Sequence, residues 1–179
     1  MHMLLASKLG ALGVLLSDVG ERAAEGLSLS AVALLLALHD RPSATATELA
    51  GIVGITQPTA VRVVEGLKRR GLTARRRRAG RTAPLCLTAA GKRRSRLLLS
   101  ARLCAIGSLI AGLSIEERAS LEQTLDKVLR AATTSRAFAR TTCRLCDHGA
   151  CDGPRCPIGM RASELERGTG VAYRGGEAC

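Results

Sequence analysis

Residues 45–71 read TATELAGIVGITQPTAVRVVEGLKRRG, and the rest of the expected architecture is built around them. The stretch opens on Thr45-x-x-Glu48, a capping box in which the hydroxyl and the carboxylate each bond a backbone N–H that the helix leaves unpaired. Gly54 is a typical helix terminator, and Thr56 followed by Pro58 is typical of a helix start. Two short helices joined by a tight glycine-containing turn predict a helix-turn-helix.

The second of these helices has two distinct faces. Ala60, Val64 and Leu67 recur at spacings of three and four and are expected to pack on a core. The opposite face and its borders carry polar or accessible side chains, namely Gln57, Thr59, Val61, Arg62 and Glu65. We expect this second face to be free for a partner.

The flanking segments complete a winged helix. Helices are expected over about residues 3–24 and over 29–39, the latter behind Ser28 as N-cap. Residues 72–76 and 83–87 predict two antiparallel strands around a basic loop. Thr88 caps a helix to about residue 112, and a second capping box opens one from residue 114 to about 140. The expected fold is mainly α, a winged helix-turn-helix with a small two-stranded β wing and long dimerisation helices.

Composition supports a helical fold and locates the charge. Apolar residues make up 46% of the chain and aromatic residues 1%, which favours packed helices over a sheet. The segment from Arg62 to Arg96 holds thirteen Lys or Arg and one acid, Glu65, so it carries the entire net charge of +12. Such a concentration predicts a surface that binds a polyanion, whereas a dispersed charge would indicate only a solvated face.

The sequence favours a cytoplasmic protein that is not an enzyme. No stretch is expected to span a bilayer, because the apolar N-terminal segment is interrupted by Lys8, and no cleavable leader is evident. Seven cysteines without an export signal predict a reducing compartment. No Ser–His–Asp set, paired carboxylates or phosphate loop supports catalysis.

The segment from Leu27 to Leu129 resembles the MarR family of winged helix-turn-helix regulators. The resemblance is carried, in order, by LSLSAVALLLAL, ATELAGIVGITQPTAVRVVEGLKRRGL, RTAPLCLTAAG and GLSIEERASLEQTL. It implies a homodimer with intertwined terminal helices, whose two recognition helices enter successive major grooves of a pseudopalindromic double-stranded DNA operator. A small-molecule effector is also compatible with this interpretation.

The resemblance assigns DNA-contacting roles to individual residues. Thr56, Gln57 and Thr59 match the polar start of the recognition helix, and Arg62 matches an exposed arginine suited to guanine O6 and N7. Val61 departs from the family pattern, in which a small polar residue is more usual, and its methyl groups suit a thymine methyl. Arg81 matches an arginine at the wing tip that reaches the minor groove. The other expected DNA contacts are the wing arginines Arg75, Arg76, Arg77 and Arg78.

Some of these residues also have simpler interpretations. Gln57 and Thr59 fit ordinary helix capping. Arg69 and Arg70 fit a solvated surface that contacts phosphates at most, which positions a protein on DNA without reading sequence.

Four cysteines lie within fourteen residues near the end of the chain. Their spacing is Cys143-x2-Cys146-x4-Cys151-x4-Cys156, among glycines, prolines and aspartates that favour turns. Four thiolates suit a tetrahedral zinc ion or an iron–sulfur cluster, while metal-free thiols would act as a redox switch or have no role. His148 could replace one ligand but is more typical of an exposed loop. Cys86 and Cys104 are expected to be small buried hydrophobes.

The expected organisation has three parts. Residues 1–140 form the DNA-binding and dimerisation domain, residues 141–160 a cysteine-rich metal-binding segment, and residues 161–179 a flexible tail. The leading hypothesis is a dimeric, sequence-specific DNA-binding transcription regulator that responds to metal or redox state. The alternatives are a small metal- or redox-active protein whose basic face binds a partner, and an RNA or single-strand binder, which the near absence of aromatic residues disfavours.

Overall fold

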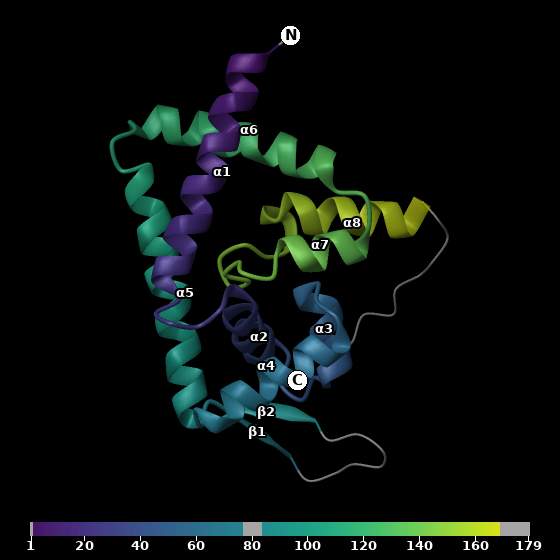
Figure 1. Ribbon diagram of the computed structural model, residues 1–179. Helices are drawn as coiled ribbons and strands as arrows, with labels where there is room; N and C mark the ends of the chain where they lie inside the picture. Colours follow the sequence, from purple (N-terminus) through teal and green to yellow (C-terminus); the bar gives the residue numbers. More distant parts are fainter. Residues whose placement is uncertain (1, 77–83, 169–179) are drawn as a thin grey trace. The chain divides into compact units, whose positions relative to one another are not determined.

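The chain divides into two units, Met1–Leu113 and Ser114–Cys179. The computed structural model describes residues 2–76 and 84–168 of the chain (Figure 1). The described structure is mainly helical with one two-stranded sheet, which confirms the predicted fold class. In the second unit, the helix that follows Ser114 packs against the last described helix.

The first unit contains the winged helix-turn-helix. Its elements are α1 (Met3–Ala23), α2 (Leu29–Asp40), α3 (Ala46–Val53), α4 (Gln57–Arg69), β1 (Thr73–Arg75), β2 (Leu85–Leu87) and α5 (Ala89–Leu109). Every residue of α2 from Ala31 to Leu38 is buried, so this helix forms the centre of the unit. Helices α3, α4 and α5 and the sheet pack around it. Most of the fully buried core side chains are aliphatic, among them Leu34, Leu35, Leu38, Leu49 and Leu98.

The predicted helix starts are found in the structure. The Ser28 hydroxyl accepts a hydrogen bond from the N–H of Ala31, and the Thr88 hydroxyl from the N–H of Gly91. The Thr45–Glu48 capping box is complete, with both reciprocal bonds formed. The Thr45 backbone N–H and then its hydroxyl, both bonded to the carboxylate, lower the pKa of Glu48. These caps fix where α2, α3 and α5 begin.

The wing begins where the sequence predicted it. Strands β1 and β2 are antiparallel, with Thr73 opposite Leu87 and Arg75 opposite Leu85. A further backbone bond joins the Leu85 N–H to the carbonyl of Ala44 at 3.1 Å, which ties the segment before α3 to β2. Residues 77–83, which include the predicted contacts Arg77, Arg78 and Arg81, lie outside the described residues.

Helix α1 differs from the expectation for the N-terminal segment. By length and composition alone it could cross a membrane, which we had not expected of any stretch, and only 11% of its apolar window is buried. Core helices of soluble proteins and signal sequences pass the same test, so this finding is weak evidence for a membrane span. Helix α1 packs against α5, and the two run side by side in Figure 1.

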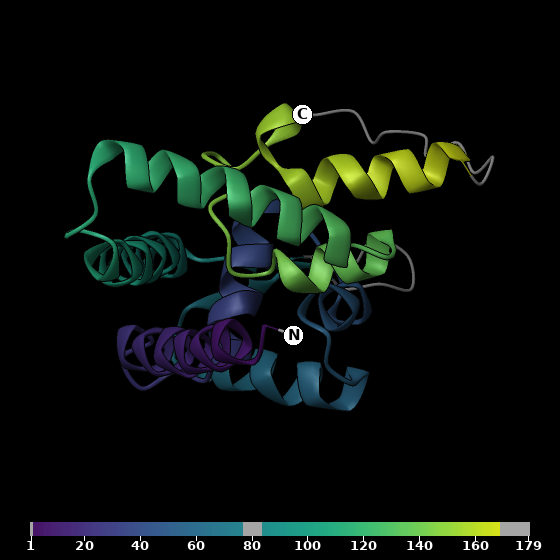
Figure 2. The same cartoon turned by 90° about the horizontal axis from the view of Figure 1, so that it is seen from above.

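The second unit consists of α6 (Ile115–Ala132), α7 (Arg136–Thr142), a 3-10 turn η1 (Gly153–Arg155) and α8 (Pro157–Gly168). Helices α6 and α7 both pack against α8, and Figure 2 shows the yellow α8 beside the green α6. The capping box of Ser114 and Glu117 opens α6 as predicted.

Two predictions for this unit need correction. The helix expected from residue 114 to about 140 is broken, because Thr133 is extended and the Ser135 hydroxyl caps a new helix by accepting the Phe138 N–H at 3.0 Å. Residues 161–168, which were expected to belong to a flexible tail, are part of α8, and Ala162 is buried there. Residues 169–179 lie outside the described residues.

Candidate nucleic-acid interface and cysteine cluster

The turn between α3 and α4 is set by one glycine. Gly54 adopts a left-handed conformation with φ +75°, which favours glycine over residues with a side chain. Its N–H and that of Ile55 both donate to the carbonyl of Ala50, at 2.9 and 3.1 Å. The chain therefore reverses within a few residues, and α4 starts immediately after Thr56.

Helix α4 presents the two faces that the sequence predicts. Its buried residues are Ala60, Val64 and Leu67. The five predicted contact residues at its start and on its other face are exposed: Thr56, Gln57, Thr59, Val61 and Arg62. This accessible face combines a hydroxyl, an amide, a methyl group and a guanidinium, which together can bond phosphates and base edges.

Two of these residues also cap the helix. The Thr56 hydroxyl accepts the N–H of Thr59 at 3.4 Å, and the two hydroxyls are 2.8 Å apart. Capping and DNA contact are compatible, because each hydroxyl oxygen can take part in more than one hydrogen bond. The cap also holds both hydroxyls at the N-terminal end of α4, where unpaired backbone N–H groups can bind a phosphate.

The arginines of the basic segment differ in what they contact. Within the described part of the chain, the Arg62 guanidinium makes no hydrogen bond or ion pair. Arg75, by contrast, donates to the Glu65 carboxylate of α4 at 2.7 Å, and Arg76 donates to the Ser43 hydroxyl at 3.1 Å. Sequence reasoning missed the Glu65–Arg75 pair, although Glu65 is the sole acid between Arg62 and Arg96. The pair braces β1 against α4.

A shallow hollow lies between the start of α2 and α4 in the described structure. Its volume is about 180 Å³, and its lining includes Leu27, Ala31, Val63, Leu67 and Arg70. Pockets for drug-sized ligands usually measure roughly 300–1,000 Å³. This hollow is therefore too small to support a large effector within the first unit.

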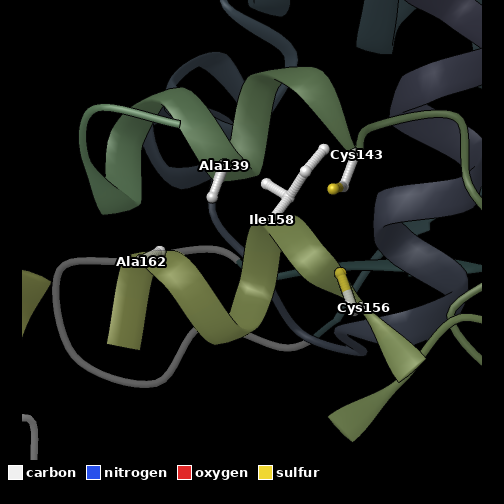
Figure 3. Packing of buried hydrophobic residues seen from close by; sticks show 5 residues of the cluster. All are labelled: Ala139, Cys143, Cys156, Ile158 and Ala162. Atoms are coloured by element: carbon white, nitrogen blue, oxygen red, sulfur yellow. The ribbon is translucent and has the colours of Figure 1, made fainter. Parts of the chain in front are cut away.

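The four clustered cysteines lie at the facing ends of α7 and α8 and on the loop between them. Cys143 ends α7, Cys156 immediately precedes α8, and both are buried with Ala139, Ile158 and Ala162 (Figure 3). The half-buried Cys146 and Cys151 pack against the same cluster from the loop. The structure thus brings all four together, as the spacing suggested.

The thiols interact with one another. A hydrogen bond with Cys146, burial and the neighbouring Cys156 raise the pKa of the Cys143 thiol far above its ordinary value. Burial, followed by the proximity of Cys156 and Cys146, raises the pKa of Cys151 to about 11. Without a nearby cation these thiols stay protonated at neutral pH.

The described side chains do not form a preformed metal site. Among residues 2–76 and 84–168, no group of three or more His, Cys, Asp or Glu side chains is arranged to hold a metal ion as it stands. His148 is exposed in the loop. Cys86 is half-buried in β2, and Cys104 is exposed on α5, which corrects its expected burial. Cys104 points outward because it falls outside the stripe of α5 that contains Ser95 and Leu98.

The comparisons with known proteins agree with the fold. Residues 25–81 match the sequence model of the MarR family. None of the curated proteins matches the chain. Many solved structures do match, and each of those described next covers 69–73% of this chain and at least 90% of its own.

Three of these structures illustrate the likeness. The MarR family protein Rv2887 of Mycobacterium tuberculosis is 24% identical with a TM-score of 0.60, and it has also been crystallised in complex with DNA. MepR, a transcription regulator of the Staphylococcus aureus multidrug efflux pump MepA, is 20% identical with a TM-score of 0.60. CouR of Rhodococcus jostii RHA1, bound to p-coumaroyl-CoA, is 19% identical with a TM-score of 0.54.

Proposed function

Because this chain carries the winged helix-turn-helix of the MarR family, we propose that it is a transcription regulator that binds double-stranded DNA in a sequence-specific manner as a homodimer. The observation that carries the proposal is the accessible face of α4, where Arg62 is exposed and has no partner in the described chain. A bidentate guanidinium on a helix narrow enough to enter the major groove suits a guanine edge.

The charge distribution supports DNA as the partner. The excess positive charge of the chain falls between Arg62 and Arg96, the segment that forms most of α4, the wing and the start of α5. The complex of Rv2887 with DNA is an example of a protein of this fold that binds DNA. A regulator that acts on chromosomal DNA would work in the cytoplasm of a bacterial cell, and this role requires no catalytic group.

Uncovered apolar side chains support the homodimer. Helix α1 exposes a series of large apolar residues, which a second copy of the chain would bury: Met3, Leu4, Leu5, Leu9, Leu12, Val14 and Leu15. Large exposed apolar surfaces on soluble proteins often mark sites of association with another protein. A two-fold dimer would also present two α4 helices to the two halves of a pseudopalindromic operator.

We further propose that DNA binding responds to a signal received by the cysteine cluster, through its metal or redox state. The cluster forms part of the core of the second unit, so a change at its thiols alters the packing of α7 against α8. Such a change affects DNA binding only if the two states of the protein differ in affinity for the operator. A small-molecule effector is a second candidate signal, suggested by the CouR complex alone.

A competition assay tests the proposed function. A duplex selected from a random library would be bound to the full chain and challenged with unrelated duplex, single-stranded DNA and RNA. We expect the selected duplex to compete best, with an affinity that falls roughly 10³-fold between 50 and 200 mM salt because several arginines displace counterions. Equal competition by RNA or by single strands would contradict the proposal and favour the alternative nucleic-acid binder.

A further inference from the structure

The second unit has a small core for its length. In its described part, residues 114–168, α6 has no buried residue, and the buried apolar cluster consists of Ala139, Cys143, Cys156, Ile158 and Ala162. Two of these five side chains are thiols and two are alanines. Units with so little apolar burial usually depend on a further constraint, such as a disulfide or a structural metal. The described cysteines form no disulfide.

We propose that Cys143, Cys146, Cys151 and Cys156 bind one metal centre as four thiolates, and that this centre holds the second unit together. The shared chemistry is tetrathiolate coordination, which suits a zinc ion or an iron–sulfur cluster. Binding of Zn²⁺ would release the four thiol protons without any change of oxidation state. The four thiols are already neighbours, and their sulfur atoms need to move into coordinating positions around the metal.

The start of α8 is shaped around one sulfur atom. The Gly159 N–H donates to Cys156 Sγ at 3.2 Å, and a Cβ at Gly159 would lie 3.2 Å from the same atom. Glycine therefore gives the backbone close access to the sulfur. Hydrogen bonds to sulfur and the N-terminus of a helix both stabilise a thiolate, so this arrangement favours Cys156 as a ligand.

The loop brings the two middle cysteines back toward the helix ends. The Cys146 N–H donates to the carbonyl of Cys143 at 3.0 Å, and the Cys151 N–H to that of Asp147 at 2.8 Å. The Asp147 carboxylate also accepts the N–H of Gly149 at 2.9 Å, and Gly153 turns the chain with φ +55°. These backbone hydrogen bonds and turns hold the loop that carries Cys146 and Cys151 between the ends of α7 and α8.

A buried donor close to the cluster has no acceptor of its own. Arg140 lies one turn before Cys143 on α7, and its Nε is buried without a hydrogen-bond partner among the described residues. The Arg140 charge already helps to lower the pKa of Glu166, and a metal ion with four thiolates, which carries net negative charge, would provide a second anionic neighbour for this guanidinium.

The test is metal analysis of the full chain purified without oxygen and with thiols reduced. Zinc, iron and acid-labile sulfide would be measured per chain for the wild type, for Cys146→Ser with Cys151→Ser, and for Cys104→Ser as the matched control. We expect about one zinc, or iron with equal sulfide, in the wild type and the control, and at least a tenfold loss in the double variant. Zinc alone and iron with sulfide distinguish the two forms of the centre.

A second measurement, made on the wild-type chain, keeps the proposal testable if the double variant does not fold. Wild-type chain stripped by a chelator would be titrated with Zn²⁺ under reducing conditions, and its resistance to proteolysis between residues 114 and 168 would be followed. We expect one equivalent of Zn²⁺ to restore protection. The proposal is overturned if the stripped wild type takes up no Zn²⁺ and the purified wild type holds neither metal, or if the double variant keeps its full metal content.

The same preparations separate this proposal from the proposed function. The metal centre does not rest on DNA binding, whereas the response of DNA binding to metal does. If the four cysteines bind metal but the chain has no affinity for any duplex, the proposed DNA-binding function is refuted and the proposed metal centre stands. If the wild-type chain binds its operator normally but neither contains nor takes up metal, the proposed metal centre is refuted and the proposed DNA-binding function stands.

Discussion

Neighbouring arginines in the basic segment have different roles. The exposed guanidinium of Arg62 has no partner in the described chain, while that of Arg75 is held by Glu65 and that of Arg76 by the Ser43 hydroxyl. An arginine already bound to a carboxylate gives up that pair if it is to bind a phosphate, which reduces its net contribution. Residue type alone therefore overstates the number of arginines ready to bind DNA.

Substitution of Arg62 tests the assignment of the recognition helix. We expect Arg62→Ala to weaken binding to a selected duplex by about 1–3 kcal/mol and to relax base preference at one position in each half-site. Arg69→Ala removes an exposed arginine at the end of the same helix and should weaken all sequences alike, because it contacts phosphates at most. Binding isotherms on the selected duplex and on single-base variants would measure both effects.

The control for this pair is Lys127→Ala, an exposed cation on α6 outside the basic segment, which should leave DNA affinity unchanged. Unchanged affinity and unchanged base preference in Arg62→Ala would show that α4 does not read the operator.

At the scale of the helices, capping residues predicted where helices begin more accurately than composition predicted where they end. Thr45, Thr56, Thr88 and Ser114 each cap the helix that the sequence assigned to them. The break after Ala132 was not foreseen, because the apolar spacing continues across it. Its signal was the run Thr133, Thr134 and Ser135, whose hydroxyls compete with helical backbone bonds; Thr133 Oγ1 donates to the carbonyl of Leu129 at 2.8 Å.

Helix α8 was missed for a related reason. Its surroundings are rich in cysteine, glycine and charge, which we interpreted as a loop and a tail. Pro157 at its first position and the apolar pair Ile158 and Ala162, four residues apart, indicated a helix. The two faces of α4 could be predicted because they depend on helical spacing alone. The Glu65–Arg75 pair could not, because it depends on where β1 passes α4.

Two helical glycines provide a matched test of how α5 packs. A Cβ at Gly91 would lie 1.9 Å from the backbone oxygen of Leu72, whereas a Cβ at Gly51 on α3 would meet nothing within 4 Å. We expect Gly91→Ala to destabilise the chain by about 1–3 kcal/mol, because α5 must move away from the residues before β1. Gly51→Ala should instead stabilise it by up to about 1 kcal/mol.

Urea denaturation of both glycine variants would measure the difference. Equal stability of the two would contradict the close approach of α5 to Leu72.

For the molecule as a whole, the central prediction is association through α1. Sedimentation at micromolar concentration should give twice the chain mass of 18.7 kDa. Leu5→Glu with Leu9→Glu places two charges among the exposed apolar side chains of α1 and should shift the chain toward the monomer. Lys8→Glu changes charge on the same helix without removing an apolar side chain, so it should remain dimeric.

A wild-type chain that sediments as a monomer would leave the paired half-site arrangement without support. Recovery of the wild type in the membrane fraction would instead indicate that the exposed apolar side chains of α1 contact lipid.

The aliphatic core makes the protein nearly transparent in the near ultraviolet. The chain has no tryptophan, one tyrosine and one phenylalanine, so almost none of its own absorption lies between the peptide bands and the visible region. Charge-transfer bands of an iron–sulfur cluster, or of Co²⁺ placed in a zinc site, would therefore stand on an almost empty background. Those bands lie at longer wavelengths than the absorption of the nucleobases. The colour of the cysteine cluster could then be followed in the same cuvette while an operator is titrated in.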